Sequence, residues 1–211
     1  MSVNKIHKEA LMGKAEKLFP LFKKFEDFYL VGGTALALQI GHRISVDFDF
    51  FSGNELPIGL LQKIKRIFPG SAAEVIYKEA GQQITLLLNG VKTTFFYYPY
   101  LAVDNFVKYQ GVPISTVREI AAMKAFSIGK RLSYKDYIDW YFLLKEKRVE
   151  LKGVIALAEK KFNGDFNARL FLGQLVSISD VPVQKIDFLR DEVDRKTVEK
   201  FLADTVRNFK L

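Results

Sequence analysis

The residues best suited to chemistry lie between positions 29 and 51, in the segment YLVGGTALALQIGHRISVDFDFF. Asp47 and Asp49 are separated by one residue in the alternating run Val46-Asp47-Phe48-Asp49-Phe50. This pattern predicts a strand with both carboxylates on one face, about 7 Å apart at their Cα atoms, and with the apolar residues anchored in the core. Such a pair repels itself unless a cation lies between the two groups, and Mg²⁺ or Mn²⁺ prefers these oxygen ligands. The pattern therefore indicates a metal site; the simpler interpretation is a solvated sheet face.

A glycine pair precedes this run. Gly32-Gly33 follows a short apolar stretch and comes before a helix that we expect over residues 35–40, which Thr34 can cap and Gly41 ends. Backbone amides at a strand-to-helix turn can approach a phosphate closely, although an isolated glycine pair is usually a plain turn. Thirteen residues separate Gly33 from Asp47. A phosphate cradle followed by metal-binding carboxylates is what nucleotide chemistry needs.

A second polar group comes from the later half of the chain. Asp136 and Asp139 are three residues apart, so they share one face of a helix predicted over 134–147. Apolar residues occupy the opposite face, so we expect the face with the two acids to be open. Lys124 lies on the preceding helix, among alanines. The simpler interpretation is a surface ion pair of little energetic value.

Composition excludes several classes of protein. The 211 residues include no cysteine and only two histidines, which excludes disulfide scaffolds, thiolate sites and a histidine-rich zinc site. No G-x-x-x-x-G-K-[ST], G-x-G-x-x-G or G-x-S-x-G motif occurs, which disfavours P-loop, Rossmann and α/β-hydrolase functions. No apolar stretch is long enough to span a membrane and no signal peptide is evident, so we expect a cytoplasmic protein. The net charge of +8 favours an anionic partner.

The pattern of elements indicates an α+β fold in two parts. We expect residues 1–112 to form an α/β core with an N-terminal helix over 4–24, and residues 113–211 to form a helical subdomain packed on that core. Asn89-Gly90 is a strong hairpin signal. The other expected elements are strands at 28–31, 73–79, 83–88 and 92–98, and helices at 54–68, 115–128, 134–147, 150–162 and 194–209. A set of basic residues from 118 to 135 could follow a nucleic-acid backbone or form a solvated surface; they are Arg118, Lys124, Lys130, Arg131 and Lys135.

Two blocks of the sequence resemble a known family. The segment VGGTALALQIGHRISVDFDFF and the later block from Met123 to Leu144, which contains Lys124 and the run KDYID, are similar to the AbiEii-type nucleotidyltransferase toxins. These belong to type IV toxin–antitoxin and abortive-infection systems and to the DNA polymerase β-like superfamily.

The resemblance implies a polymerase β-like nucleotidyltransferase core with a mixed sheet, an NTP substrate and Mg²⁺ or Mn²⁺. It implies an RNA acceptor such as a tRNA end, or a protein acceptor, and a cognate antitoxin. It also implies a role for each candidate residue. Asp47 and Asp49 hold the metal, Gly32, Gly33 and Thr34 bind the phosphates, and Lys124 reaches the triphosphate. Arg43 has a place in the site, with a helix-dipole contact as its alternative, and Asp136 or Asp139 belongs to the wall.

The sequence departs from the superfamily at one position. A third carboxylate usually comes from a later central strand and acts as base, but Thr94 stands where we expect it. Three interpretations remain: the base is Asp136 or Asp139, the alignment is shifted, or catalysis is weakened. We therefore expect an enzyme that moves an NMP group to an acceptor. The alternatives are a nucleotide- or RNA-binding protein on the same fold with reduced or lost catalysis, and a plain interaction protein.

Overall fold

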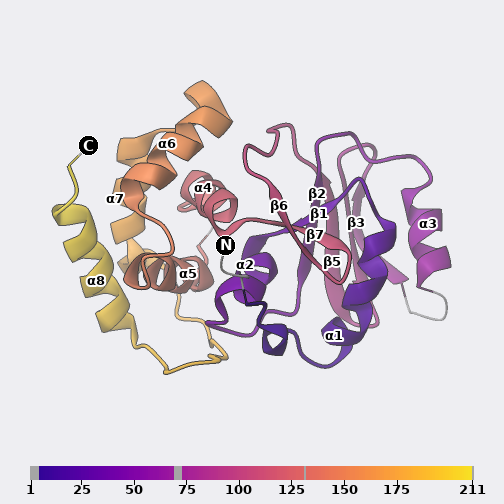
Figure 1. The fold of residues 1–211 in the computed structure, drawn as a ribbon, viewed down its shortest axis with the longest axis horizontal. Helices are drawn as coiled ribbons and strands as arrows, with labels where there is room; N and C mark the ends of the chain where they lie inside the picture. The colour runs from indigo at the N-terminus through magenta and orange to yellow at the C-terminus, as the bar shows by residue number, and fades with distance from the viewer. Residues whose placement is uncertain (1–4, 69–72, 131, 211) are drawn as a thin grey trace.

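The computed structural model describes residues 5–68, 73–130 and 132–210, and it places one mixed sheet beside a group of helices (Figure 1). This arrangement confirms the expected α+β class. The strands are β1 (Tyr29–Val31), β2 (Phe48–Ser52), β3 (Ala73–Glu79), β4 (Gln83–Leu88), β5 (Val91–Tyr97), β6 (Phe106–Tyr109) and β7 (Val112–Ser115). The α-helices are α1 (Lys14–Leu18), α2 (Gly32–Ile40), α3 (Leu60–Ile67), α4 (Val117–Ser127), α5 (Tyr134–Lys145), α6 (Leu151–Phe162), α7 (Ala168–Val176) and α8 (Arg195–Arg207). Short 3₁₀ turns are η1 (Lys8–Ala10), η2 (Phe19–Lys24), η3 (Asn163–Asp165) and η4 (Ile178–Asp180).

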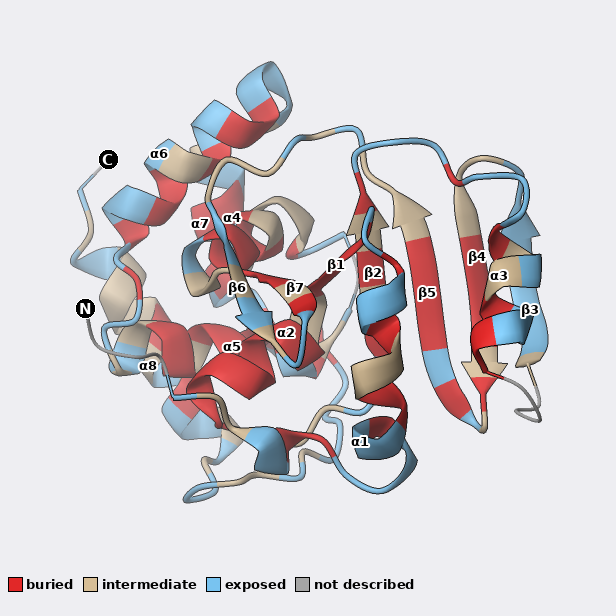
Figure 2. Cartoon of the chain, turned by 45° about the vertical axis from the view of Figure 1, so that its right-hand side comes forward, coloured by how far each residue is buried: buried red, intermediate tan, exposed pale blue. Residues whose placement is uncertain are grey.

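The seven strands lie in the order β3-β4-β5-β2-β1-β7-β6. The pairs β2/β5 and β1/β7 are parallel, and the other neighbours are antiparallel. The three central strands are largely buried, whereas most of the edge strand β3 is exposed (Figure 2). β1, which enters the first glycine turn, and β2, which follows α2, are therefore in the most buried part of the sheet.

One face of the sheet is filled by aromatic side chains. Phe22 in η2 packs on Phe48 and Phe50 of β2 with ring centroids 5.0 Å and 4.5 Å apart, and on Phe95 of β5 at 6.4 Å. Because side chains alternate along a strand, the residues between these phenylalanines, including Asp49, point to the opposite face. The core under β2 therefore fixes the side of the sheet on which the carboxylate stands.

Several expected elements are confirmed. Strands 73–79 and 83–88 have the predicted bounds, and the Asn89-Gly90 turn joins β4 to β5 with φ angles of 52° and 83°. The left-handed values at both turn positions are those that a tight hairpin with the right-handed strand twist requires.

Other expectations were wrong in part. The helix expected over 4–24 is interrupted at Gly13, whose φ is 59°, and consists of η1, α1 and η2. The β6–β7 hairpin and α7 were not anticipated. Val46 lies before β2 and is 41% exposed, so it does not anchor the strand in the core.

The helices of the second half gather at one side of the sheet, with α4 between the strands and α6 (Figure 1). β7 spans the boundary expected between residues 112 and 113 and pairs with β1, so the second part begins within the sheet; the two-part division stays a prediction. Within the described ranges no helix is both long and apolar enough to cross a bilayer.

Candidate active site

The glycine turn brings two charged side chains close to the start of α2. Gly32 has a φ of 70°, a value that favours glycine, and a Cβ built there would lie 3.1 Å from Oδ2 of Asp49. A Cβ at Gly33 would collide with the guanidinium of Arg43. Any larger residue at either position would displace one of these groups. The N-cap residue of α2, Val31, makes no side-chain bond to the first amides of the helix.

The strand carboxylates differ in their surroundings. Asp49 is within β2 and half-buried, whereas Asp47 is exposed and immediately precedes the strand. The hydroxyl of Thr34 donates a hydrogen bond to the backbone oxygen of Asp47 and lies 2.8 Å from the hydroxyl oxygen of Ser45. Thr34 therefore fixes the backbone that carries Asp47. The expectation that Thr34 caps the helix was wrong, because α2 already begins at Gly32 with Val31 as its N-cap.

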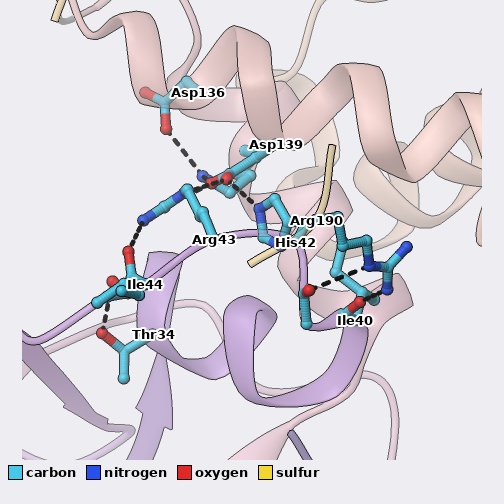
Figure 3. Close-up of polar contacts among 11 residues, drawn as sticks. Thr34, Ile40, His42, Arg43, Ile44, Asp136, Asp139 and Arg190 are labelled. Atoms are coloured by element: carbon cyan, nitrogen blue, oxygen red, sulfur yellow. Dashed lines mark hydrogen bonds and ion pairs between the residues drawn. The ribbon is translucent and has the colours of Figure 1, made fainter. Parts of the chain in front are cut away.

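A buried network of charges joins this turn to α5 (Figure 3). Asp139 is fully buried and accepts hydrogen bonds from Nε and Nη2 of Arg43 at 2.7 Å and 3.1 Å. Nε2 of His42 lies 2.7 Å from the same carboxylate, and Nζ of Lys124 lies 2.7 Å from its other oxygen. Lys124 also donates a 2.8 Å bond to Asp136. Residues from three segments are thus held together by two acids.

The face of α5 that carries Asp136 and Asp139 is therefore not open, as the helical spacing had suggested: the two residues are 3% and 0% exposed. Burial alone raises the pKa of Asp139, but Arg43, Lys124 and His42 outweigh it and hold that pKa well below its ordinary value. A base must take up a proton, and this carboxylate is stabilised in its charged form by three donors. The contacts therefore argue against Asp139 as the general base and for a role in positioning the cations.

The C-terminal segment holds the loop that carries Arg43. Phe188 forms a β-bridge with Arg43, the amide of Ile44 donates a 2.8 Å bond to the oxygen of Asp187, and Arg190 donates to the backbone oxygens at the end of α2 (Figure 3). Asp187, Phe188 and Arg190, far from this loop in the sequence, thus bind its backbone and the end of α2. The backbone of Arg43 is fixed from one side and its guanidinium from the other.

The strand register shows which residue occupies the position of the missing third carboxylate. In the parallel β2/β5 pair, Thr94 stands directly beside Asp49. Thr94 is buried, and its Oγ1 lies 3.3 Å from the hydroxyl of Thr85 on β4. This register agrees with the sequence alignment that put Thr94 at the position of the third carboxylate. A neutral hydroxyl therefore occupies the strand position next to the carboxylate of Asp49.

Two cavities meet at Asp49 and Lys124. The polar one has a volume of about 110 Å³ and takes in most of the candidate residues; its walls are Gly33, Thr34, Arg43, Ser45, Asp47, Asp49, Lys124, Ser133, Lys135 and Asp136. The apolar one has a volume of about 430 Å³ and is lined by Val31, Gly32, Asp49, Phe51, Tyr98, Ile120, Met123, Lys124, Phe126, Ser127 and Lys130. Of the nine candidates, only Asp139 lines neither cavity, which agrees with a positioning role.

The aromatic wall of the larger cavity was not identified from the sequence. Phe51 and Tyr98 lie with ring centroids 4.7 Å apart, and Nζ of Lys130 lies 3.3 Å from the ring centroid of Phe126. Burial, together with neighbouring Tyr29, Tyr100 and Glu119, raises the pKa of Tyr98, so its hydroxyl remains a donor. Phe95, in the same aromatic run, is instead buried in the core. Arg131, one of the basic candidates, lies outside the described residues.

Comparison with known proteins agrees with this geometry. Residues 16–105 match the model of the nucleotidyl transferase AbiEii toxin family of type IV toxin–antitoxin systems. The Aquifex aeolicus protein aq_aa25, whose function is uncharacterised, is 34% identical over 186 residues, which cover 87% of this chain and 88% of that protein. The chain belongs to the AbiEii nucleotidyltransferase toxin family. It is therefore a nucleotidyltransferase.

Solved structures of other proteins show the same fold. An H. pylori protein to which nucleotidyltransferase function is ascribed is 18% identical, with a TM-score of 0.60 and 92% of each chain covered. MenT4, a nucleotidyltransferase toxin from Mycobacterium tuberculosis, is 11% identical, with a TM-score of 0.53 over 94% of this chain and 87% of that one. At these identities the likeness concerns the fold. The AbiEii family match includes the glycine turn and the strand carboxylates but ends before Lys124.

Proposed function

We propose that this nucleotidyltransferase moves an NMP group from an NTP to the end of an RNA, and that a divalent metal ion held by Asp47 and Asp49 is required. The observation that carries the proposal is the junction of the polar and apolar cavities, with Asp49 and Lys124 lining both. A triphosphate needs amide and cationic donors, and a nucleobase needs apolar and aromatic surface. The junction offers each of these to one bound NTP.

Each group in the polar cavity has a role that follows from its position. The amides at the start of α2 and the guanidinium of Arg43 are suited to the phosphate oxygens. Burial lowers the pKa of Lys124, but Asp136 and Asp139 more than offset it and raise the pKa. The ammonium therefore stays charged beside the site of transfer, where fixed positive charge stabilises the departing pyrophosphate.

The carboxylates of Asp47 and Asp49 suit a magnesium ion. Mg²⁺ commonly binds one or two carboxylates and fills its remaining positions with water and substrate phosphates. The described residues form no cluster of three or more His, Cys, Asp or Glu that could enclose an ion, so a site made by Asp47 and Asp49 depends on substrate oxygens. When bound, the ion supplies Lewis-acid stabilisation of charge on the phosphoryl oxygens.

The transfer itself requires little covalent chemistry from the protein. The oxygen of an RNA hydroxyl bonds to the α-phosphorus, the bond from that phosphorus to the oxygen bridging it to the β-phosphate breaks, and pyrophosphate leaves while the hydroxyl proton passes to solvent. With Thr94 beside Asp49 and Asp139 saturated by cations, we infer that positioning and charge stabilisation dominate over a dedicated base.

An RNA acceptor is favoured by charge. The chain carries a net charge of +8, and the exposed residues Lys130 and Lys135 stand at the rims of the two cavities. A polyanion reaching the α-phosphate would pass these lysines. Within a toxin–antitoxin pair, this activity would make the protein the toxin and a second protein its antitoxin. The threonine at position 94 favours one alternative, a protein on this fold that binds nucleotide with reduced catalysis.

Incorporation of label tests the proposal. Purified protein is incubated with each α-³²P-labelled NTP and total bacterial RNA, with Mg²⁺, with Mn²⁺ or with EDTA, and the products are digested with ribonuclease or with protease. We expect metal-dependent label that ribonuclease removes. Label that only protease removes would identify a protein acceptor. Metal-dependent NTP binding without incorporation would favour the alternative.

A further inference from the structure

A second buried charge pair lies outside the polar cavity. Nζ of Lys161 in α6 is 2.6 Å from Oε1 of Glu119 in α4, and both side chains are almost completely enclosed. A buried ion pair is costly to desolvate unless its remaining hydrogen bonds are satisfied. Neither residue lines the polar cavity. The remaining hydrogen bonds of the two side chains therefore indicate what the pair positions.

Those bonds go to one irregular segment, residues 98–103, which follows β5. Lys161 donates to the backbone oxygens of Leu101 at 2.7 Å and Tyr100 at 3.3 Å. The other oxygen of Glu119 accepts a 3.2 Å bond from the amide of Val103. An irregular segment needs partners for its backbone groups, and here both members of one ion pair provide them. The pair thus attaches the segment to the α4/α6 helix pair.

The attached segment forms part of the apolar cavity. Tyr98 lines that cavity, and Nζ of Lys161 lies 5.4 Å from the centroid of its ring. Tyr100 packs edge-on against Phe162 at 4.9 Å and against Phe126 at 5.6 Å. Phe126 in turn stacks on Phe162 with centroids 4.1 Å apart, and it also lines the cavity. Two aromatic residues of the cavity wall, Tyr98 and Phe126, therefore pack near the segment and helices that this ion pair joins.

We propose that Glu119 and Lys161 are positioning residues for the nucleoside end of the bound NTP. They hold Tyr98 and, through Tyr100, Phe126 at the separation at which a base can lie against them. This rests on the proposed function, in which the base of the NTP occupies the apolar cavity and the triphosphate the polar one. Loss of the pair then weakens contacts with the nucleoside and leaves contacts with the phosphates in place. An ion pair that only stabilised the fold would not distinguish between the two ends of the ligand.

Calorimetric binding of two ligands tests the proposal: an NTP, and inorganic tripolyphosphate, which has no nucleoside. Both are titrated with Mg²⁺ into wild type, Glu119→Gln, Lys161→Met and the double variant. We expect affinity for the NTP to fall about tenfold, within the range for weakened base stacking, and affinity for tripolyphosphate to change less than about twofold. Lys160→Met is the matched control, because Lys160 is the exposed neighbour of Lys161 on α6 and should leave both affinities unchanged.

Single variants leave one buried charge without its partner and could fail to fold. The double variant removes both charges, and Tyr98→Leu removes the half-exposed ring that the pair is proposed to position. Equal losses for both ligands, or no loss in either the double variant or Tyr98→Leu, would overturn the positioning role. Wild-type protein that binds tripolyphosphate as tightly as every NTP would instead count against the base cavity of the proposed function.

Discussion

The carboxylates on the two sides of the polar cavity differ in burial and in their partners. On the strand side, Asp47 is exposed and Asp49 is half-buried. On the helix side, Asp136 and Asp139 are buried and paired with cations at hydrogen-bond distance. An accessible acid can exchange water for a metal ion and substrate, whereas a buried acid saturated by cations mainly determines where those cations stand. The difference supports the proposal that the strand side acts on the ligand, and it suits the helix side to positioning Arg43 and Lys124.

The largest effect is expected on the strand side. Asp47→Asn halves the charge available to a metal ion without disturbing a buried contact. We expect nucleotide transfer to fall by at least about 10³-fold, while the melting temperature stays within about 2 °C of wild type. Radiolabel incorporation and thermal unfolding measure the two quantities. Asp191→Asn, at another exposed aspartate, is the control and should leave transfer unchanged.

A substitution on the helix side is expected to lower the unfolding free energy of the protein. Asp139→Asn leaves Arg43, Lys124 and His42 around an uncharged group, and removing one partner of a buried ion pair typically costs about 3–5 kcal/mol. Urea unfolding measures this loss. Asp204→Asn breaks an exposed pair with Arg207 and should cost less than about 1 kcal/mol. An unfolding free energy for Asp139→Asn within 1 kcal/mol of wild type would contradict the positioning role.

The pH dependence of stability is expected to show a smaller effect that depends on His42. Burial lowers the pKa of His42 below its ordinary value of 6.5, although the neighbouring Asp139 opposes this. The unfolded chain therefore binds a proton at His42 before the folded protein does. The stabilisation is complete above pH 6.5 and is lost as pH falls below that value, by at most about 1.4 kcal/mol per pH unit.

Urea unfolding of wild type and His42→Gln at pH 7.5 and pH 5.5 tests this dependence. We expect the loss of stability between the two pH values to be smaller in the variant. Asp139 has a depressed pKa, so its own contribution is lost only below about pH 4, outside this range. Equal losses in the two proteins would mean that His42 does not carry the effect.

The mildest prediction concerns Thr94. Thr94→Asp places a third carboxylate beside Asp49, and we expect Mn²⁺ affinity, measured by calorimetry without nucleotide, to increase about tenfold. Thr94→Val keeps the shape of the side chain and should leave metal affinity unchanged. Unaltered affinity in Thr94→Asp would mean that the strand pair does not bind the metal, or that position 94 does not face it.

The features that could be predicted from the sequence are those that neighbouring residues determine. The Asn89-Gly90 hairpin, the glycine turn and the alternation from Phe48 to Phe50 are determined by neighbouring residues and are present in the structure. The expected strand over 46–50 was wrong at its start, because β2 begins at Phe48 and leaves Asp47 outside it. The spacing of Asp136 and Asp139 correctly placed them on one helical face, but it could not show what packs on that face. The burial of Asp139 depends on Arg43, 96 positions away, and on the fold that joins the two segments.

The apolar cavity escaped prediction for the same reason. Its wall combines the end of β2, the segment after β5 and one face of α4, and no single stretch of sequence carries the pattern. A signal was available in hindsight: Tyr98 and Tyr100 follow a strand and flank a proline, a position where aromatic residues leave the sheet. Glu119 and Lys161 gave no local signal, because each resembles an ordinary exposed residue of an amphipathic helix.

The position of the transferred phosphorus tests the central claim most directly. Wild-type protein, Mg²⁺ and acceptor RNA are incubated in parallel with the same NTP labelled at the α- or the γ-phosphorus. If the strand side performs nucleotidyl transfer, the α-label enters the RNA and the γ-label leaves as pyrophosphate in equal amount. Entry of the γ-label into the acceptor, or incorporation of the α-label at the wild-type rate by Asp47→Asn, would contradict the account.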